Sequence, residues 1–139
     1  LDHLDQWSLR RRQNALHYRR LFKKHGLSAS DMVLPHEADY HVYNQFVIRS
    51  PYRDALKQEL TAAGVSVEVY YPVALHRQKC FSSLGYKEGS LPQSERAAKE
   101  TLALPIYPEI SKSQQEYVVS KIARFYSGKR EFLSKRSAD

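Results

Sequence analysis

Apolar residues recur with helical spacing at both ends of the chain. In residues 1–25 they lie mostly three or four positions apart, or multiples of these, which predicts one long helix that Gly26 ends. The apolar residues of this helix are Leu4, Trp7, Ala15, Tyr18 and Phe22. Toward the other end, Ser111 followed by Gln114 is typical of a capping box that opens a last helix. Its apolar face is expected to contain Val118, Val119, Ile122, Phe125 and Tyr126.

Two strands and a connecting helix are predicted between these ends. Residues 41–49 and 65–71 are rich in β-branched and aromatic side chains that alternate between two faces, and Pro72 ends the second strand. In between, Ser50 as N-cap and Pro51 at the first helical position predict a helix that Gly64 ends. One face of the first strand is expected to carry Val42, Phe46 and Ile48. The buried stripe of the helix is expected to comprise Ala55, Leu56, Leu60 and Ala63.

A short helix over residues 76–84, a helix over residues 94–101 and a short strand over residues 102–104 complete the predicted order. This order predicts an α/β fold: a small two-layer domain with a two- to three-stranded sheet covered by helices. Two strands joined by a helix are normally parallel neighbours, whereas a third strand inserted between them would make the neighbours antiparallel. The pattern leaves both arrangements open.

The composition is that of one soluble globular domain, with 139 residues, of which 42% are hydrophobic and 27% charged. No stretch approaches the roughly 18 apolar residues of a membrane span. The start shows neither a signal peptide nor an initiator Met, as expected of a fragment or a processed product. The single cysteine, Cys80, excludes an internal disulfide and a Cys-based zinc site, and makes a reducing cytoplasm the expected location. The net charge of +7 favours polyanionic partners, either nucleic acid or a phosphate-bearing ligand.

The chain carries no self-sufficient catalytic motif. A dinucleotide-binding glycine pattern, a P-loop, His-Glu-x-x-His and Gly-x-Ser-x-Gly are all absent. The six histidines are scattered without the spacing of metal ligands. His76 and Cys80 are one helical turn apart, but a small apolar thiol on a helix is far commoner than a nucleophile with its base. We therefore expect neither catalytic residues nor a metal site in this chain.

One cluster of polar rings follows the second predicted strand. Tyr70, Tyr71 and His76 lie at or just beyond its carboxyl end, where ligands tend to bind in α/β sheets. Phenol and imidazole groups can bond a phosphate, a sugar hydroxyl or a carboxylate. An equally open interpretation is that Tyr71 continues the buried valine face and His76 only begins a helix.

Several motifs, in order, resemble one family. They are Leu1–Trp7 with the following Arg10–Arg12, then His41–Val47, Tyr71–His76, Leu84–Gly89, Pro92–Glu95 and Leu102–Glu109. Together they resemble the C-terminal part of the DegT/StrS-type nucleotide-sugar aminotransferases, which depend on pyridoxal phosphate (PLP) and have fold type I. The resemblance implies a linking helix over residues 1–26 and a C-terminal small α/β domain over residues 27–127. Residues 128–139 are polar and lack periodicity, so we expect them to form a flexible tail.

The resemblance also implies what the intact protein does. Its family moves an amino group from glutamate to a keto-sugar linked to a nucleoside diphosphate, as a cytoplasmic homodimer. The PLP-binding lysine belongs to a large N-terminal domain that does not align to this chain, so the chain alone is expected to be inactive. Tyr71 matches the family's His-Tyr-Pro motif, Tyr70 replaces its usual histidine, and His76 matches Pro-x-x-Leu-His. Tyr70, Tyr71 and His76 are thus the expected substrate-binding residues.

Two other functions compete with this one. The chain could be a basic nucleic-acid-binding module built on the first helix and on residues 129–136, or a nucleotide-sugar-binding domain without catalysis. The arginines of the first helix point in different directions, which favours a solvated surface over a nucleic-acid-reading helix. If a large domain covers this one in the intact protein, part of the apolar surface is bare here. The candidates are Trp7, Tyr18, Tyr70, Tyr71 and Phe81.

Overall fold

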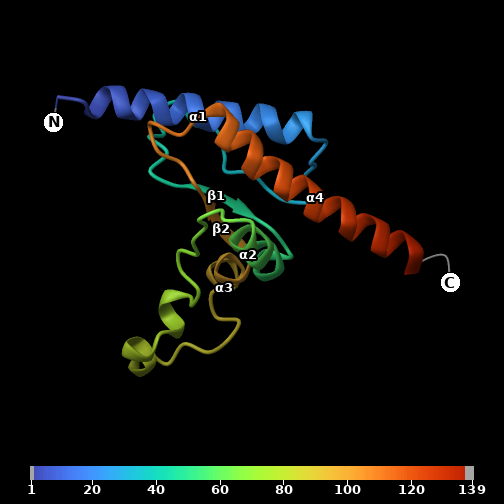
Figure 1. The fold of residues 1–139 in the computed structure, drawn as a ribbon. Helices are drawn as coiled ribbons and strands as arrows, with labels where there is room; N and C mark the ends of the chain where they lie inside the picture. The colour runs from blue at the N-terminus through green and yellow to red at the C-terminus, as the bar shows by residue number, and fades with distance from the viewer. Residues whose placement is uncertain (1, 137–139) are drawn as a thin grey trace.

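The computed structural model describes residues 2–136. Its order is α1 (Leu4–Lys24), β1 (Phe46–Arg49), α2 (Arg53–Ala62), the 3-10 turns η1 (Leu75–Arg77) and η2 (Lys79–Leu84), α3 (Pro92–Glu100), β2 (Thr101–Leu104) and α4 (Lys112–Arg136). Figure 1 shows the small sheet beneath α1 and α4, with η1 and η2 on the opposite side of it. The predicted α/β fold class is therefore confirmed.

The sheet settles the strand arrangement that the pattern left open. β1 and β2 are antiparallel, from Phe46 opposite Leu104 to Arg49 opposite Thr101. On the other edge of β2, Glu68 pairs with Ala103 through two backbone hydrogen bonds of 2.7 and 3.2 Å. β2 is thus inserted between β1 and the segment that follows α2, so the neighbours are antiparallel.

Both predicted strands of the first half are shorter than their sequence pattern. Tyr43 has a φ of 47°, which a strand cannot accommodate, so β1 begins only at Phe46 and Val42 is half-exposed. In the second segment Val65 and Val67 are buried as expected, but only Glu68 pairs with a neighbour. The predicted strand over residues 65–71 is therefore wrong in extent: it is a single bridge.

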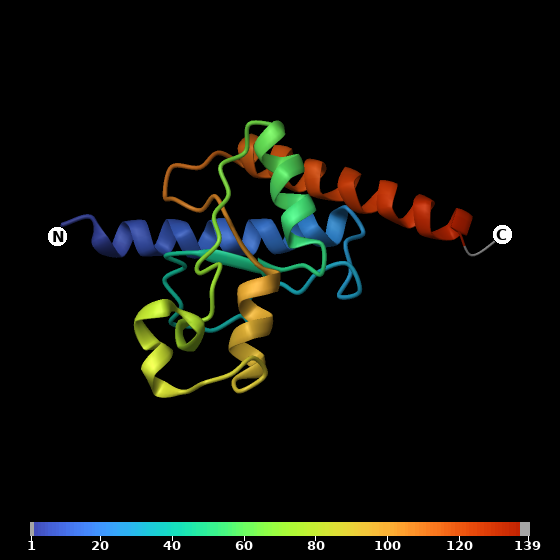
Figure 2. The ribbon, with the colours of Figure 1, turned by 90° about the horizontal axis from the view of Figure 1, so that it is seen from below.

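The core lies on one face of the sheet, under the helices. Phe46 and Ile48 of β1, together with Leu102 and Leu104 of β2, point toward it. The helices contribute fully or nearly fully buried side chains, which are Tyr18 and Phe22 of α1, Leu56 and Leu60 of α2, and Val119 and Ile122 of α4. Figure 2 shows α1 and α4 lying side by side along this layer. Leu4 and Trp7 were predicted to share the apolar face of α1 but are 50% and 42% exposed, because the buried face starts only at Ala15.

One predicted helix end is confirmed, and two predicted features of α2 are wrong. The capping box of α4 is confirmed: the Ser111 amide donates to Gln114 Oε1 (2.8 Å) and the Gln114 amide donates to Ser111 Oγ (3.1 Å). Ser50 is not the N-cap of α2, because its Oγ accepts from the Tyr52 amide (3.0 Å) and holds the turn before the helix. Ala55, predicted in the buried stripe of α2, is exposed.

α4 continues past Gly128 to Arg136, so residues 128–136 of the expected polar tail are helical. Lys129, Arg130 and Glu131, which follow Gly128, have good helix propensity, which helps to offset the roughly 1 kcal/mol that a glycine costs. Residues 137–139 of that tail lie outside the described residues. The division into a linking helix, a small domain and a tail stays a prediction.

Candidate functional site

The face of the sheet opposite the core carries a polar hollow. Side chains alternate along a strand, so Val47 and Ala103 point away from the core, and Glu68 joins them by its pairing with Ala103. Tyr70 lies two residues further on the same side. Of the residues lining the hollow, the polar ones are Asn44, Gln45, Ser66, Glu68 and Tyr70, and the others are Ala103, Leu104, Pro105 and Ile106.

Asn44 and Gln45 reach the hollow through an unusual turn. The backbone of Tyr43 lies in the left-handed region, which non-glycine residues rarely adopt. Its amide donates to Nδ1 of His41 (2.8 Å), the two rings stack at 4.2 Å, and the Tyr43 side chain is buried. These contacts fix the turn and leave the next two residues exposed at the start of β1.

Tyr70 and Tyr71 both reach solvent. Tyr70 is 46% exposed and Tyr71 is 71% exposed, and their rings meet edge to face at 6.1 Å. The interpretation in which Tyr71 continues the buried valine face is therefore wrong. Two amphipathic rings beside a polar hollow can bond a ligand hydroxyl and stack against its apolar face.

His76 is placed differently from the two tyrosines. It is buried, whereas both tyrosines are exposed, and like Tyr71 it is not among the residues that line the hollow. Its Nε2 lies 3.0 Å from Oε1 of Glu95, and the Tyr86 ring stands edge-on to it at 5.7 Å. Glu95 also accepts backbone hydrogen bonds from Gly89 (2.9 Å to each oxygen) and Leu91 (3.4 Å). The Gly89 amide above all, and then His76, hold the pKa of Glu95 below its ordinary value, so the carboxylate is ionised and Nε2 of His76 donates.

The described residues contain few side-chain groupings that could carry out chemistry by themselves. Among residues 2–136, no three His, Cys, Asp or Glu side chains are grouped so as to hold a metal ion. In the same range, no helix is long and apolar enough to cross a membrane. Cys80 is exposed and its Sγ faces Gln78, while His76 bonds Glu95, so the two do not form a nucleophile–base pair.

Of the polar residues that line the hollow, sequence reasoning identified Tyr70 and missed Asn44, Gln45, Ser66 and Glu68. The alternation of residues 65–71 puts Ser66, Glu68 and Tyr70 on one face, which is a signal that could have added Glu68. Asn44 and Gln45 carry no such signal. Their position depends on the turn at Tyr43 and on the insertion of β2 beside β1.

The chain is similar to proteins of one known family. The model of the DegT/DnrJ/EryC1/StrS aminotransferase family matches residues 1–123, which is most of the chain. The chain belongs to this family. A "Pleiotropic regulatory protein" of Geobacillus stearothermophilus is 50% identical over 127 residues, which are 89% of this chain and 33% of that protein. The dTDP-3-amino-3,4,6-trideoxy-alpha-D-glucose transaminase of Streptomyces venezuelae is 32% identical over 122 residues, which are 88% of this chain and 32% of that enzyme.

Solved structures of the aminotransferase family share the fold. The crystal structure of S. venezuelae DesV, in complex with a ketimine intermediate, superposes with a TM-score of 0.83 at 32% identity, over 90% of this chain and 33% of DesV. A family aminotransferase from Brucella abortus superposes with a TM-score of 0.77 at 28% identity, over 90% of this chain and 32% of its own. The chain thus spans about a third of the length of the relatives it matches.

Aminotransferases of this family generally depend on PLP, which a lysine anchors. The described lysines do not fit that role: none of them is buried and none lines the hollow beside Tyr70. The residues present are therefore not those of a PLP anchor, and no chemical step through the cofactor is assigned to this chain.

Proposed function

We propose that this chain is the C-terminal small domain of a PLP-dependent sugar aminotransferase, and that it supplies part of the site for the sugar substrate. The observation that carries the proposal is the polar hollow beside Tyr70 in a chain of this family. The full protein would transfer an amino group from glutamate to a nucleotide-linked keto-sugar. Relatives support this substrate class, since one is a dTDP-sugar transaminase and another a UDP-N-acetyl-3-dehydro-alpha-D-glucosamine 3-aminotransferase.

The chemistry of the hollow favours the sugar over the diphosphate as its ligand. The side-chain amides of Asn44 and Gln45 can donate to and accept from hydroxyl groups, and Tyr70 adds a phenol. Glu68 brings a negative charge, which would repel a diphosphate but accept hydrogen bonds from a sugar hydroxyl or amine. We therefore assign the sugar ring to Tyr70 and Tyr71, with the diphosphate directed away from Glu68.

Other parts of the proposal come from outside the described residues. The large N-terminal domain would hold PLP and most of the glutamate site, so the chain alone would be inactive. The protein would act as a cytoplasmic homodimer. These assignments rest on the family to which the chain belongs.

The test is to separate the two half-reactions in the full-length protein. Glutamate would load the cofactor normally in Tyr70→Phe and Tyr71→Phe, while the sugar half-reaction would weaken by about tenfold, because each variant loses a polar contact worth about 1–3 kcal/mol. Tyr117→Phe is the matched control, since the Tyr117 hydroxyl donates to the Ala63 carbonyl at the end of α2 and Tyr117 does not line the hollow. Equal loss in both half-reactions would place the tyrosines in folding or cofactor binding.

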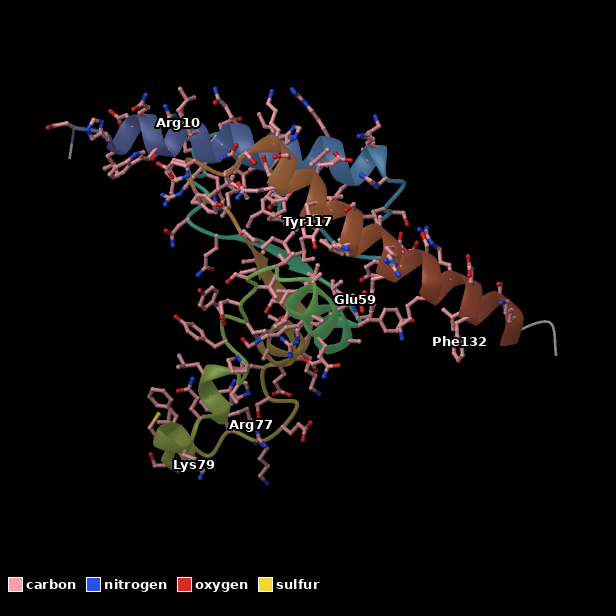
Figure 3. All side chains as sticks on the ribbon, in the orientation of Figure 1. Arg10, Glu59, Arg77, Lys79, Tyr117 and Phe132 are labelled. Atoms are coloured by element: carbon pink, nitrogen blue, oxygen red, sulfur yellow. The ribbon has the colours of Figure 1, made fainter. Side chains whose placement is uncertain are left out.

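The nucleic-acid-binding alternative has less support from the basic side chains. Arg12 and Arg19 of α1 donate to the carbonyls of Asp39 and Pro35, and Arg19 also lies 3.7 Å from Glu37. Figure 3 shows Arg10 on α1 at the opposite end of the view from Arg77 and Lys79. Basic residues thus lie on both sides of the sheet (Figure 1). Nucleic-acid binding that weakens steeply with salt would favour this alternative.

A further inference from the structure

Residues 72–91, here called the arm, have almost no core of their own. They comprise η1, η2 and the loop that leads to α3, and only Ala74 and His76 among them are buried. The remaining apolar side chains of the arm are exposed, namely Val73, Leu75, Phe81, Leu84, Tyr86 and Leu91. Segments with so little buried apolar surface are poorly held by packing. Among residues 2–136, a polar contact therefore takes a large share in holding the arm.

That contact is a hydrogen-bonded clasp between the arm and α3. Glu95, in the first turn of α3, receives His76 Nε2 from one end of the arm and the amides of Gly89 and Leu91 from the other. The His76 side chain is 5% exposed and that of Glu95 is 12% exposed. A charged acceptor with several donors, shielded from water, makes stronger hydrogen bonds than an exposed pair.

The clasp also anchors the C-terminal end of the segment that contains Tyr70 and Tyr71, because His76 follows these tyrosines in the chain. The other end of this segment is Glu68, which pairs with Ala103 of β2. α3 runs directly into β2, from Glu100 to Thr101, so Glu95 and Ala103 belong to one continuous stretch. Residues 69–75, which include Tyr70 and Tyr71, are therefore held at both ends: Glu68 pairs with Ala103, and His76 bonds Glu95. Both partners belong to the continuous segment formed by α3 and β2.

We propose that His76 is a positioning residue: its hydrogen bond to Glu95 holds the arm on α3 and thereby sets where Tyr70 and Tyr71 stand beside the hollow. His76 then need not touch the substrate, and Glu95 is as important as His76 for the sugar half-reaction. The effect on activity rests on the proposed function. The effect on the arm does not.

The experiment measures hydrogen exchange of the arm amides and both half-reactions in the full-length protein. His76→Leu and Glu95→Gln should each raise the exchange rate of residues 72–91 about tenfold, because a hydrogen bond to a charged group is lost or weakened. The double variant should be no faster than Glu95→Gln alone, because that change already weakens the bond from His76 together with those from Gly89 and Leu91. Both single variants should raise KM for the sugar nucleotide and spare the glutamate half-reaction.

Two further variants separate positioning from direct contact. His76→Gln keeps an N–H donor near the position of Nε2, so it should restore most of the protection and most of the sugar half-reaction. Glu88→Gln is the matched control, because Glu88 lies on the arm with a side chain 75% exposed, and only a long 3.9 Å contact to Lys99 engages it. It should change neither readout.

The outcomes are distinct. If His76→Leu damages the sugar half-reaction while arm exchange stays unchanged and Glu95→Gln is silent, His76 is a ligand and the proposal is overturned. If the arm loosens and sugar turnover is unaffected, the clasp does not position the tyrosines and the proposal is again wrong. If the unaltered protein shows neither half-reaction, the proposed function fails, and the exchange data still decide whether the clasp holds the arm.

Discussion

The side-chain hydroxyls of Ser50 and Tyr126 lie 2.6 Å apart in the interior and join the end of β1 to α4. Ser50 is fully buried and Tyr126 is 2% exposed. Ser50 Oγ also accepts from the Tyr52 amide, so one serine links a strand, a helix start and a distant helix. Burial raises the pKa of Tyr126 above its ordinary value, and the hydrogen bond with Ser50 lowers it in part. This pair connects the sheet to the helical layer above it.

Replacing either partner should destabilise the chain, and Ser50→Ala should cost more. It removes two hydrogen bonds and leaves the buried Tyr126 hydroxyl without its partner, a loss of about 2 kcal/mol. Tyr126→Phe removes only one bond and leaves Ser50 bonded to the Tyr52 amide, a loss of about 1 kcal/mol. Urea denaturation of the chain would measure both, with the exposed Tyr117→Phe as control. A larger loss in Tyr126→Phe would contradict this account.

Three glutamates should make the fold sensitive to acid. The pKa values of Glu95, Glu100 and Glu116 lie below their ordinary value, chiefly because of hydrogen bonds from the Gly89 amide, Arg49 and His25 respectively. The unfolded chain then binds protons more readily than the folded one. The stabilisation is complete above about pH 4.5, the ordinary value, and is lost as the pH falls through the lower folded pKa values.

Denaturation midpoints between pH 7 and pH 3 would measure this loss. Glu100→Gln should flatten the acid limb, because it removes the charge that Arg49 and Arg96 engage. A variant with an unchanged acid limb would show that the arginine contacts do not persist in solution.

The long helices could be predicted because their signals are local, whereas the short helix predicted over residues 76–84 is instead the pair of 3-10 turns η1 and η2. The capping box of α4 and the glycines after α1 and α2 act on neighbouring residues, and the structure has these ends where expected, within one or two positions. The order of the sheet is not local. It depends on Ala103 pairing with Glu68 on one side and with Val47 on the other, across long stretches of chain. Strand propensity in residues 65–71 could not reveal that only one residue pairs.

The candidate site, too, has parts with local sequence signals and parts that depend on contacts between distant segments. Tyr70 and Tyr71 follow a strand-like pattern that Pro72 ends, so the sequence marks them as candidates, and their role stays a prediction. The partner of His76 is Glu95, 19 residues later, and nothing in the motif around His76 indicates it. The polar hollow also needs the left-handed backbone of Tyr43, which a tyrosine adopts only because His41 and the core hold it. Contacts between distant segments therefore set the parts that sequence reasoning missed.

The chain alone should not bind PLP stoichiometrically. Its described lysines are surface residues, and a lysine anchor needs a dry site that favours the neutral amine. Titrating the 139-residue chain with PLP should give no saturable visible absorption band. A stoichiometric band that borohydride removes would contradict this prediction and would point to a lysine with an unexpected environment.

The isolated chain should also self-associate through its uncovered aromatic residues. Trp7, Tyr70, Tyr71 and Phe81 are 42%, 46%, 71% and 36% exposed, as expected of a domain that another covers. Tyr18, predicted among them, is fully buried and donates its hydroxyl proton to the Pro105 carbonyl (2.9 Å), so it belongs to the core instead. Exposed apolar patches recruit partners, while the net charge of +7 opposes association.

Sedimentation over a concentration series, at low and moderate salt, would measure the balance between these two effects. Moderate salt screens the charge, so association should strengthen as salt rises. Trp7→Gln should weaken it, because Trp7 lies in the exposed first part of α1, where the helix has no buried residue before Ala15. Gln13→Ala, at an exposed polar position of the same helix, is the matched control. A monomer at every concentration and salt would mean that the exposed aromatic residues need no cover, and that the small domain is complete as it stands.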